Sequence, residues 1–327
     1  MIARTTNELA SIVKPGACVT IGNFDGVHLG HQRLLARVRD KARQEGLASV
    51  VITFDPHPLR VILGQTPPFI TLIGQKLSLL EARGLDAVLC LEFTKDMAEL
   101  SPDAFVAEYL VRGLNLKELI IGHDYAFGKN RAGNYEVLKR IGQEEGFSVE
   151  RIEPVYRNGE VVSSTRIRRL IQSGRVDEAR PLLGRCFQIT GTVIEGQKRG
   201  GPILGIPTAN LKLEDELFPK TGVYAVWAEL EGAVYPAVAN VGHNPTFGQN
   251  ALSVEVHIFD FKQVIYGRSL RVHMVKRLRS EKRFSGIEEL LAQIHRDMAK
   301  ARDVLAQPTQ PIDTTDEGTT TNTAEGQ

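Results

Sequence analysis

The sequence predicts an N-terminal α/β domain with a doubly wound parallel sheet, followed by a small antiparallel β-barrel with a C-terminal helix. Three observations predict this class. The 327 residues correspond to about two domains of ordinary size. The first half alternates short apolar runs with amphipathic helical stretches, which is typical of α/β domains. The second half changes to strands separated by turn residues, which is typical of small barrels.

The predicted strands of the first half are short, rich in Val and Ile, and apolar on both faces, as in a buried parallel sheet. They cover 18–22, 49–54, 86–93, 118–122 and 147–155. The stretch 31–46 between the first two carries apolar residues at helical spacing and ends in a glycine. Parallel strands need right-handed crossovers, so we expect ligands at the carboxyl ends of the strands.

The composition of the chain changes after 173–185, where we predict a last helix and a linker. We place the α/β domain at 1–183, the barrel at 184–305 and a disordered tail at 306–327. The segment AELEGAVY predicts a tight hairpin at Glu231 and Gly232. The last helix is predicted to start at an N-cap, Ser285, with Glu288 three residues on.

The overall composition argues against several classes of protein. Hydrophobic residues make up 42% of the chain, as in ordinary soluble proteins, and the net charge of +1 gives no reason to expect a nucleic-acid partner. No apolar run approaches the ~20 residues of a membrane span, and the N-terminus lacks the apolar core of a signal peptide. Three scattered cysteines argue against a disulfide framework or a zinc site. We expect a cytoplasmic protein with no membrane partner and no obligate protein partner.

The stretch IGNFDGVHLGHQRLL (21–35) places two histidines, His28 and His31, between the first predicted strand and its helix. Gly22, Gly26 and Gly30 let the backbone turn sharply and approach a ligand closely. A helix N-terminus binds anions, and imidazoles can donate hydrogen bonds to phosphate oxygens. We therefore favour phosphoryl or nucleotidyl transfer here over two ordinary loop histidines or a zinc pair.

Two further segments of the first half are less specific. His57, in TFDPHP (53–58), follows the second strand between two prolines and is either structural or substrate-lining. The segment VVSSTRIRRLIQSG (161–174) places hydroxyls and arginines at a helix start. That pattern suits phosphates, but it also fits an ordinary capped basic helix.

The second half holds a candidate metal pair and a candidate base. Thr208 and Asn210, in GIPTANLKL (205–213), share a face if extended, and their hard oxygen atoms suit Mg²⁺ with ATP phosphates. The same segment equally fits a plain turn and strand. Glu255, in LSVEVHIFD (252–260), lies on the polar face of a strand. Such a residue is either solvated or a general base for an alcohol attacking a γ-phosphate, and its position alone leaves both open.

The motifs GNFDGVHLGH, TFDPHP, GHDYAFGKNRAG and SSTRIR together resemble the FMN adenylyltransferase domain of the prokaryotic bifunctional riboflavin kinase/FAD synthetases, in the HxGH nucleotidyltransferase superfamily. The resemblance implies that His28 and His31 are catalytic. It implies that the ATP site comprises Gly22, Phe24, Asp25, Gly30, Ser164, Thr165 and Arg168. The residues that it implies around flavin or adenine are Asp55, Pro56, His57, Asp124, Phe127 and Gly128.

The run GTVIEG, RGG, LGIPTANL, PKTGVYAV, ANVGHNPTF, VEVHIFDF, YGRSLRV and LRSEKRF resembles the riboflavin kinase domain in order and spacing. The resemblance implies that Thr208 and Asn210 bind Mg²⁺ and phosphates, and that Glu255 deprotonates the ribityl 5′-hydroxyl. It places Arg279 and Phe284 in a mobile flavin-side segment. The remaining implied contacts of kinase ATP and flavin are Gly196, Lys198, Arg199 and Gly200.

One loop departs from the family pattern H-G-x-x-x-G-R-x-L-G-F-P-T-A-N. Here Glu195 precedes Gly196, a Gly-Gly-Pro run replaces the Gly-Arg pair, and the loop over 195–202 is one residue longer. Lys198 and Arg199 still supply positive charge to this loop. The departure leaves the affinity and the contacts of the kinase nucleotide site open.

The resemblance implies a two-step enzyme that phosphorylates riboflavin to FMN and then joins AMP from a second ATP to FMN, giving FAD and pyrophosphate. Its partners are the small molecules riboflavin, FMN, FAD and ATP, with Mg²⁺ as cofactor and no tightly bound prosthetic group. One alternative keeps the adenylyltransferase with a feeble kinase, because of the altered 195–202 loop. Another is a flavin- or RNA-binding regulator on a decayed scaffold, against which the intact catalytic groups argue.

Overall fold

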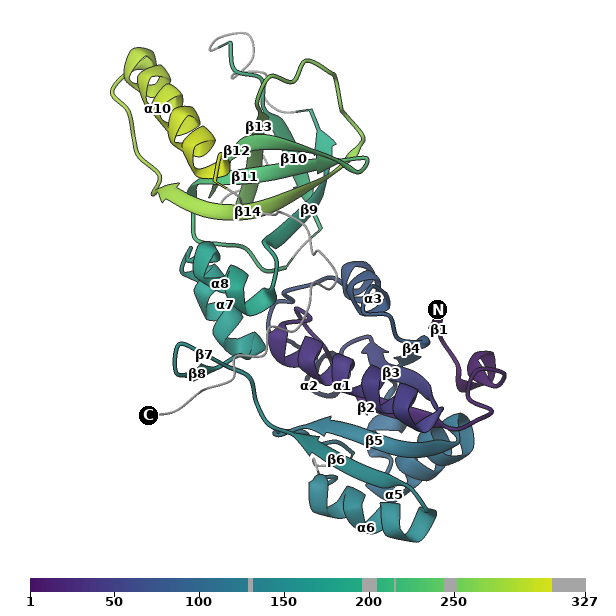
Figure 1. The fold of residues 1–327 in the computed structure, drawn as a ribbon. Helices are drawn as coiled ribbons and strands as arrows, with labels where there is room; N and C mark the ends of the chain where they lie inside the picture. The colour runs from purple at the N-terminus through teal and green to yellow at the C-terminus, as the bar shows by residue number, and fades with distance from the viewer. Residues whose placement is uncertain (129–131, 196–204, 215, 244–251, 308–327) are drawn as a thin grey trace, which may run out of the picture.

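The computed structural model of the chain describes residues 1–128, 132–195, 205–214, 216–243 and 252–307. Figure 1 shows a parallel sheet with its helices at one end of the molecule and a closed barrel at the other. Between them lie α7 (Ser164–Gln172) and α8 (Val176–Leu183). The predicted fold class, α/β followed by an antiparallel barrel and a helix, is confirmed.

The parallel sheet has six strands in the order β1-β4-β3-β2-β5-β6. Their bounds are Ile2–Ala3 (β1), Ala17–Ile21 (β2), Ala48–Asp55 (β3), Ala87–Glu92 (β4), Leu116–Gly122 (β5) and Ser148–Ile152 (β6). The chain fills one side of the sheet from β2 to β4 and then crosses back to β5. The order therefore reverses between β2 and β5, and the crevice at the carboxyl ends of two such strands is where ligands bind.

Helices and short turns connect these strands. Their bounds are Thr6–Leu9 (the 3-10 helix η1), Leu29–Glu45 (α1), Pro58–Leu63 (α2), Ile73–Glu81 (α3), Lys95–Glu99 (α4), Pro102–Phe105 (α5), Val106–Arg112 (the π-helix η2) and Tyr135–Glu145 (α6). As predicted, α1 buries one apolar face and ends at Gly46, whose φ of 67° lies in the left-handed region. Across the described residues no helix is both long and apolar enough to span a membrane.

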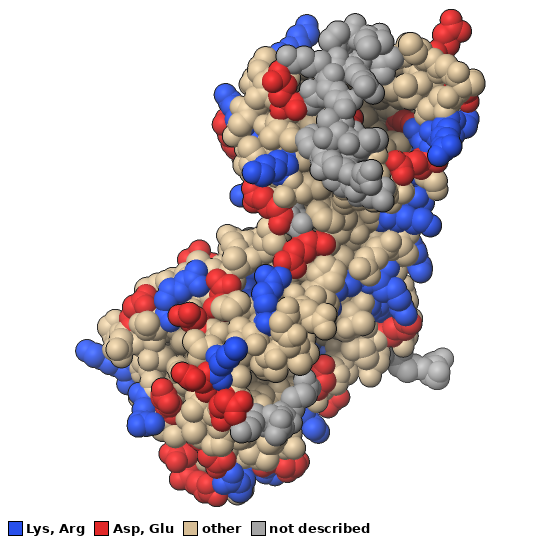
Figure 2. Space-filling view, turned by 180° about the vertical axis from the view of Figure 1, so that it is seen from behind, with Lys and Arg blue, Asp and Glu red and all other residues tan. Residues whose placement is uncertain are grey.

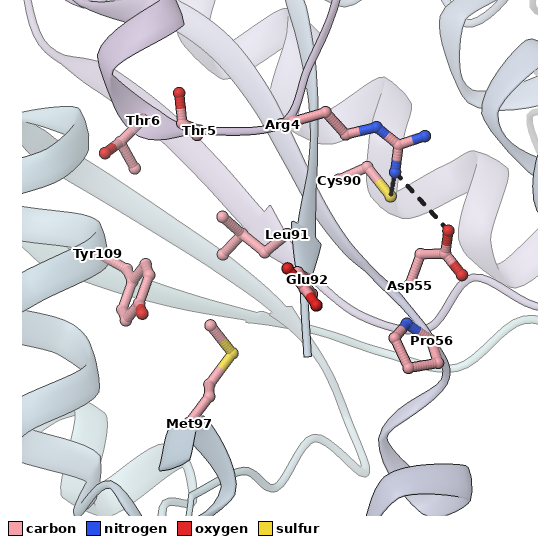
Figure 3. Close-up of a pocket in the computed structure, with 10 residues that line it drawn as sticks. All are labelled: Arg4, Thr5, Thr6, Asp55, Pro56, Cys90, Leu91, Glu92, Met97 and Tyr109. Atoms are coloured by element: carbon pink, nitrogen blue, oxygen red, sulfur yellow. Dashed lines mark hydrogen bonds and ion pairs between the residues drawn. The ribbon is translucent and has the colours of Figure 1, made fainter. Parts of the chain in front are cut away.

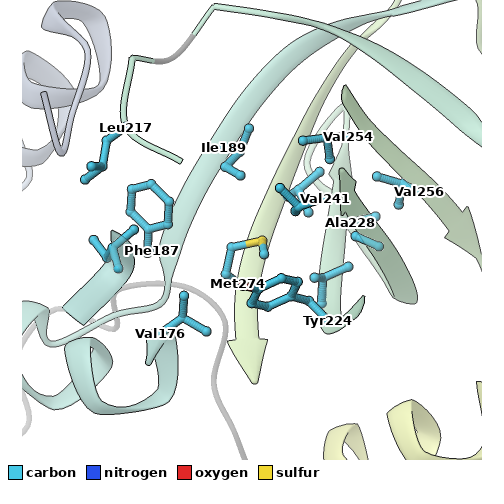
Figure 4. Close-up of a cluster of buried hydrophobic side chains, with 14 of the residues drawn as sticks. Val176, Phe187, Ile189, Leu217, Tyr224, Ala228, Val241, Val254, Val256 and Met274 are labelled. Carbon is cyan, nitrogen blue, oxygen red and sulfur yellow. The ribbon is translucent and has the colours of Figure 1, made fainter. Parts of the chain in front are cut away.

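The barrel closes in the order β10-β13-β12-β11-β14-β9. Its strands run over Phe187–Ile194 (β9), Ala209–Leu213 (β10), Gly222–Leu230 (β11), Ala233–His243 (β12), Leu252–Ile258 (β13) and Ser269–Arg279 (β14). Alternate apolar residues fill the interior, among them Val241, Val254 and Met274 (Figure 4). The two-residue turn at Glu231 and Gly232 has φ of 51° and 84°, which confirms the predicted tight hairpin.

The last helix, α10 (Ile287–Leu305), packs beside the barrel and differs in its cap from the prediction (Figure 1). Gly286, not Ser285, occupies the N-cap position. The backbone nitrogen and the hydroxyl of Ser285 donate to Glu289, at 3.0 and 2.9 Å. The capping box with Glu288 was therefore wrong, because the carboxylate one position later reaches back over the first turn.

The helices between the parallel sheet and the barrel share one hydrophobic core with the barrel. A short hairpin, β7 (Tyr156–Arg157) and β8 (Glu160–Val161), leads into α7. Apolar residues of α7 and α8, including Ile171 and Leu182, belong to the same buried cluster as the barrel interior. The segment predicted as a helix and linker is thus a helix that packs on the barrel. Arg60 of α2 also pairs with Glu216, at 2.6 Å.

Charge is mixed on the surface. On the face drawn in Figure 2, Lys and Arg side chains are interspersed with Asp and Glu over both lobes of the molecule. This distribution fits the net charge of +1. On that face the charges do not collect into a patch of one sign of the kind that attracts a polyanion.

Two helical glycines should respond oppositely to alanine. At Gly142 in α6 an added Cβ would lie 2.5 Å from the carbonyl oxygen of Phe147, whereas at Gly74 in α3 it would meet no atom within 4 Å. We expect Gly142→Ala to lower the free energy of unfolding by about 1–3 kcal/mol through this clash. Gly74→Ala should raise it by up to about 1 kcal/mol. Urea unfolding followed by circular dichroism measures both, and equal stability of the two variants would contradict the geometry.

Candidate active sites

A buried carboxylate organises the loop between β2 and α1. Asp25 is 6% exposed, and its Oδ1 accepts hydrogen bonds from the backbone nitrogens of Ile70 and Thr71, at 3.0 and 3.1 Å. Its Oδ2 accepts from Arg168 at 2.7 Å. Ser164 donates to the backbone carbonyl of Asp25 at 2.9 Å. Three residues that the sequence assigned to ATP are therefore brought together, and they join α7 to this loop.

The two histidines of the H-x-G-H motif stack at the start of α1. The ring centroids of His28 and His31 lie 3.6 Å apart, with 18° between the planes. His28 caps the helix, because its Nδ1 accepts from the backbone nitrogen of His31 at 3.4 Å. Gly30 leaves room for this arrangement, since an added Cβ would lie 3.1 Å from the His28 ring. Phe24 packs edge-on against His31, with 5.2 Å between centroids.

Burial keeps both imidazoles neutral near pH 7. Desolvation lowers the pKa of His28 to about 4, against the opposing influence of Asp25 and Asp124. Desolvation, followed by His28 and Lys76, lowers the pKa of His31 well below its usual range. The Nδ1 of His31 is buried and has no hydrogen-bond partner among the described residues. The pair can therefore donate hydrogen bonds to an anion without first carrying a charge.

Lys76 on α3 is a candidate site residue that the sequence analysis did not predict. It is 7% exposed, and its Nζ donates to the carbonyl of Phe54, at the carboxyl end of β3, at 3.2 Å. Desolvation lowers its pKa. The positive charge of Lys76 lowers the pKa of both His31 and His57, which places it near both rings. The available signal was its position four residues before Leu80, on the buried face of α3.

The structure gives His57 a capping contact. It is the N-cap of α2, and its Nδ1 accepts from the backbone nitrogen of Leu59 at 3.1 Å. Its ring lies 5.5 Å from that of Phe69. Desolvation, followed by Lys76, lowers the pKa of His57 to about 4. Of the two alternatives drawn from the sequence, the cap supports a structural role.

A pocket of about 670 Å³ opens at the carboxyl ends of β3 and β4 (Figure 3). This volume suits a small organic ligand. Two of the predicted flavin or adenine residues, Asp55 and Pro56, line it. Its other described lining residues are Arg4, Thr5, Thr6, Cys90, Leu91, Glu92, Met97 and Tyr109. His57, Asp124, Phe127 and Gly128 are not among them.

The residues predicted after β5 do not all lie near the histidines. The side chain of Asp124 is 84% exposed, and its charge raises the pKa of His28, which places it on the histidine side. Phe127 instead packs against Tyr125, with 5.6 Å between ring centroids. Gly128 follows with a φ of 71°, a left-handed conformation that favours glycine.

The remaining predicted ATP residues lie at element ends near this crevice. The backbone nitrogen of Gly22 donates to the carbonyl of Ile52 at 3.0 Å, so it continues the pairing of β2 with β3. Thr165 is exposed in the first turn of α7. Ser163 caps that helix by accepting from the backbone nitrogen of Arg166 at 3.3 Å. Their positions are compatible with a ligand at the N-terminus of α7.

A second row of polar residues crosses the outside of the barrel. Glu255 on β13 is in register with Asn210 on β10 and with Asn240 on β12. The interior positions beside it are taken by Val254 and Val256, so the polar row faces outward. Asn210 is 9% exposed. Asn240 was not predicted, because only strand pairing places it beside the glutamate.

The segment that carries Thr208 is fixed by a histidine. The Nδ1 of His257 lies 2.7 Å from the carbonyl oxygen of Pro207, directly before Thr208. His257 is two residues beyond Glu255 and therefore on the same face of β13. The candidate metal pair and the candidate base thus belong to one face of the barrel. Gly196, Lys198, Arg199 and Gly200 lie outside the described residues.

Arg279 and Phe284 lie where β14 runs toward α10. Arg279 donates through Nε to Asp297 of α10 at 2.8 Å, and its Nη2 lies 2.7 Å from the same carboxylate. Asp297 is 3% exposed. The guanidinium of Arg279 also lies 5.9 Å from the centroid of the Phe284 ring. Arg279 therefore anchors the segment before α10 through a buried carboxylate.

The lowered histidine pKa values predict a pH dependence of stability. An unfolded histidine has a pKa of about 6.5, so the unfolded chain binds more protons than the folded chain between pH 6.5 and 4. The free energy of unfolding should fall as the pH drops through this window. His28→Asn keeps a capping acceptor but cannot titrate. In this variant the free energy of unfolding should therefore depend less steeply on pH, by the equivalent of about one proton. Urea unfolding at several pH values measures the slope, with His295→Asn on α10 as control. An unchanged slope in His28→Asn would contradict the assignment.

Comparison with known proteins assigns a family to each half of the chain. The FAD synthetase family matches residues 11–166, and the riboflavin kinase family matches residues 183–305. A bifunctional riboflavin kinase/FMN adenylyltransferase of Pseudomonas fluorescens is 41% identical over 89% of this chain and 94% of its own. Its counterpart in Escherichia coli K12 is 36% identical over 92% and 97%. A crystal structure of a Streptococcus pneumoniae chain described as a macrolide-efflux protein matches with a TM-score of 0.83 and 33% identity, over 93% and 98%. The chain belongs to the family of bifunctional riboflavin kinase/FMN adenylyltransferases.

Proposed function

We propose that this chain is a bifunctional enzyme of flavin cofactor synthesis. Its barrel transfers the γ-phosphate of ATP to riboflavin, giving FMN and ADP. Its α/β domain then joins AMP from a second ATP to FMN, giving FAD and pyrophosphate. The observation that carries the proposal is that one chain pairs stacked histidines at a helix start with a glutamate in register with Asn210. The free, buried cysteines support a reducing compartment, which we infer to be the cytoplasm.

The adenylyl transfer is assigned to the crevice between β2 and β5. The triphosphate of ATP would lie at the N-terminus of α1, where unpaired backbone nitrogens and the helix dipole favour anions. An oxygen of the FMN phosphate forms a bond to the α-phosphorus as the bond to the pyrophosphate oxygen breaks. His28 and His31 would donate to the oxygens on which charge develops. Buried Lys76 would add a positive charge on the β3 side.

Within this proposal Arg168 and Asp25 act mainly by holding the loop. Arg168 already forms an ion pair with Asp25, and its Nε donates to the carbonyl of Pro68 at 3.0 Å. Its remaining influence on phosphates is that of a positive charge close to the loop. Gly22, Phe24 and Gly30 would shape the backbone around the nucleotide. The pocket beside Asp55 and Pro56 would hold the flavin ring, since it is partly apolar and of suitable volume.

The kinase step is assigned to the outer face of the barrel. Glu255 would take the proton of the ribityl 5′-hydroxyl, whose oxygen then attacks the γ-phosphorus as ADP leaves. The Thr208 hydroxyl and the Asn210 amide oxygen are hard donors that fit Mg²⁺. When bound, the ion would neutralise phosphate charge. Arg279 and Phe284 would contact riboflavin. The assignment of 195–202 as the nucleotide loop rests on its sequence.

The first experiment follows the products of the purified chain incubated with riboflavin, ATP and Mg²⁺. Chromatography should show FMN appearing first and then converting to FAD. In His28→Ala the reaction should stall at FMN, with FAD formation reduced about 10²–10³-fold, because a donor to the developing charge is lost. FAD formation at the wild-type rate in this variant would contradict the role of His28.

A second variant separates the two activities. Glu255→Gln keeps the size of the side chain but cannot accept the proton, so FMN formation should fall by about 10²–10⁴-fold. FAD formation from supplied FMN should continue in the same variant, which controls for folding. Unchanged FMN formation would show that Glu255 is not the base. If the wild-type chain makes FAD from FMN but no FMN from riboflavin, the altered 195–202 loop has cost it the kinase.

A further inference from the structure

We propose that the N-terminal strand and turn supply a flavin-binding residue, Arg4, whose guanidinium donates hydrogen bonds to the carbonyl edge of the FMN ring. The inference rests on the proposed adenylyltransferase function and adds a contact to its flavin pocket. Arg4 precedes the FAD synthetase match, which begins at residue 11, and it belongs to none of the sequence motifs. What points to it is its place in the structure.

Strand pairing fixes the position of Arg4. The short strand β1 runs parallel to β4, with Ile2 opposite Val88 and Ala3 opposite Leu89. Arg4 follows and contacts the next residue of β4, where its Nη1 lies 3.1 Å from the Sγ of Cys90. Ala3 is fully buried. Arg4 is therefore held at the carboxyl end of β4 by the sheet.

The turn after β1 is also fixed. One carboxylate oxygen of Glu8 accepts from the backbone nitrogens of Arg4 and Thr5, at 3.2 and 2.9 Å, and from the Thr5 hydroxyl at 2.8 Å. Thr5 and Thr6 line the same pocket as Arg4. The segment therefore forms an ordered side of the pocket, held in place by hydrogen bonds.

The pocket places a donor beside an acceptor. The Nη1 of Arg4 lies 3.7 Å from the Oδ2 of Asp55, and Figure 3 shows the guanidinium reaching toward that carboxylate. Within the described residues both polar contacts of the Arg4 side chain use Nη1, which leaves Nε and Nη2 for a ligand. The pyrimidine edge of a flavin alternates carbonyl acceptors with an N–H donor. Arg4 and Asp55 together match that alternation.

The other residues of the pocket favour the ring over the phosphate. Leu91, Met97 and Tyr109 provide apolar and aromatic surface for a flat heterocycle. Among the described lining residues, the carboxylates of Asp55 and Glu92 outnumber the one cation, Arg4. Such a balance repels a phosphate dianion but accepts a neutral ring. The carbonyl edge of the flavin is therefore the partner of Arg4.

The test compares steady-state kinetics of FAD formation from FMN in wild type and Arg4→Ala. We expect the KM for FMN to rise about tenfold with little change in kcat, because a contact to the ring edge is equally strong in the ground and transition states. Arg4→Lys keeps the charge without the planar fork, so its KM should lie between the two. Riboflavin kinase activity of the same variants should equal that of wild type, which shows that the barrel is folded, and the retained kcat for FAD shows the same for the α/β domain.

A matched control is Arg140→Ala, which removes an exposed arginine that pairs with Asp103 and Glu144 on the surface. It should leave the KM for FMN unchanged. An unchanged KM in Arg4→Ala, with the wild type active, would overturn the inference. A fall in kcat at constant KM would place Arg4 at the reacting phosphates, which also overturns it. A wild type that makes no FAD from FMN would instead refute the proposed function, and the inference with it.

Discussion

The buried ion pair between Asp25 and Arg168 is the interaction on which the first site depends. It joins the loop after β2 to α7, although the two segments are far apart in the chain. Through its other oxygen the carboxylate also fixes the backbone that leads into α3. Removal of one member of such a pair leaves an uncompensated charge, which costs about 3–5 kcal/mol. The histidines, the α1 N-terminus and the α7 N-terminus keep their mutual geometry because this charge is satisfied.

Around that anchor the site is built from groups that favour anions without carrying much charge themselves. His28 and His31 are neutral, and Lys76 is a buried cation that contacts the backbone of β3. Such an arrangement costs less in the empty protein than a cluster of buried positive charges. The negative charge of bound phosphates would raise the pKa of both imidazoles and so favour their protonated form. Preorganised neutral donors and one cation therefore suit a reaction in which negative charge moves between oxygens.

The sequence pattern predicted those parts of the fold and of the first site that depend on residues close together in the chain. The strands around the first site are apolar on both faces, and the H-x-G-H motif lies between a strand and a helix. Lys76 was missed because a lysine within a helix normally points to solvent, and only the tertiary packing that brings it to the end of β3 buries it. Asn240 and Arg4 required strand register, which joins residues distant in the chain. The cap of α10 was misplaced by one residue because two neighbouring glutamates could reach Ser285.

The hydrophobic core that α7 and α8 share with the barrel has a consequence for synthesis of the chain. The ribosome releases these helices before β9 to β14, so their apolar face stays uncovered until the barrel strands have been made. During that interval the nascent α/β domain presents surface of the kind that aggregates or recruits chaperones. Completion of the barrel then covers it. The second domain thus acts as the folding partner of the first. A gene truncated between them would produce an α/β domain whose last two helices expose an apolar surface.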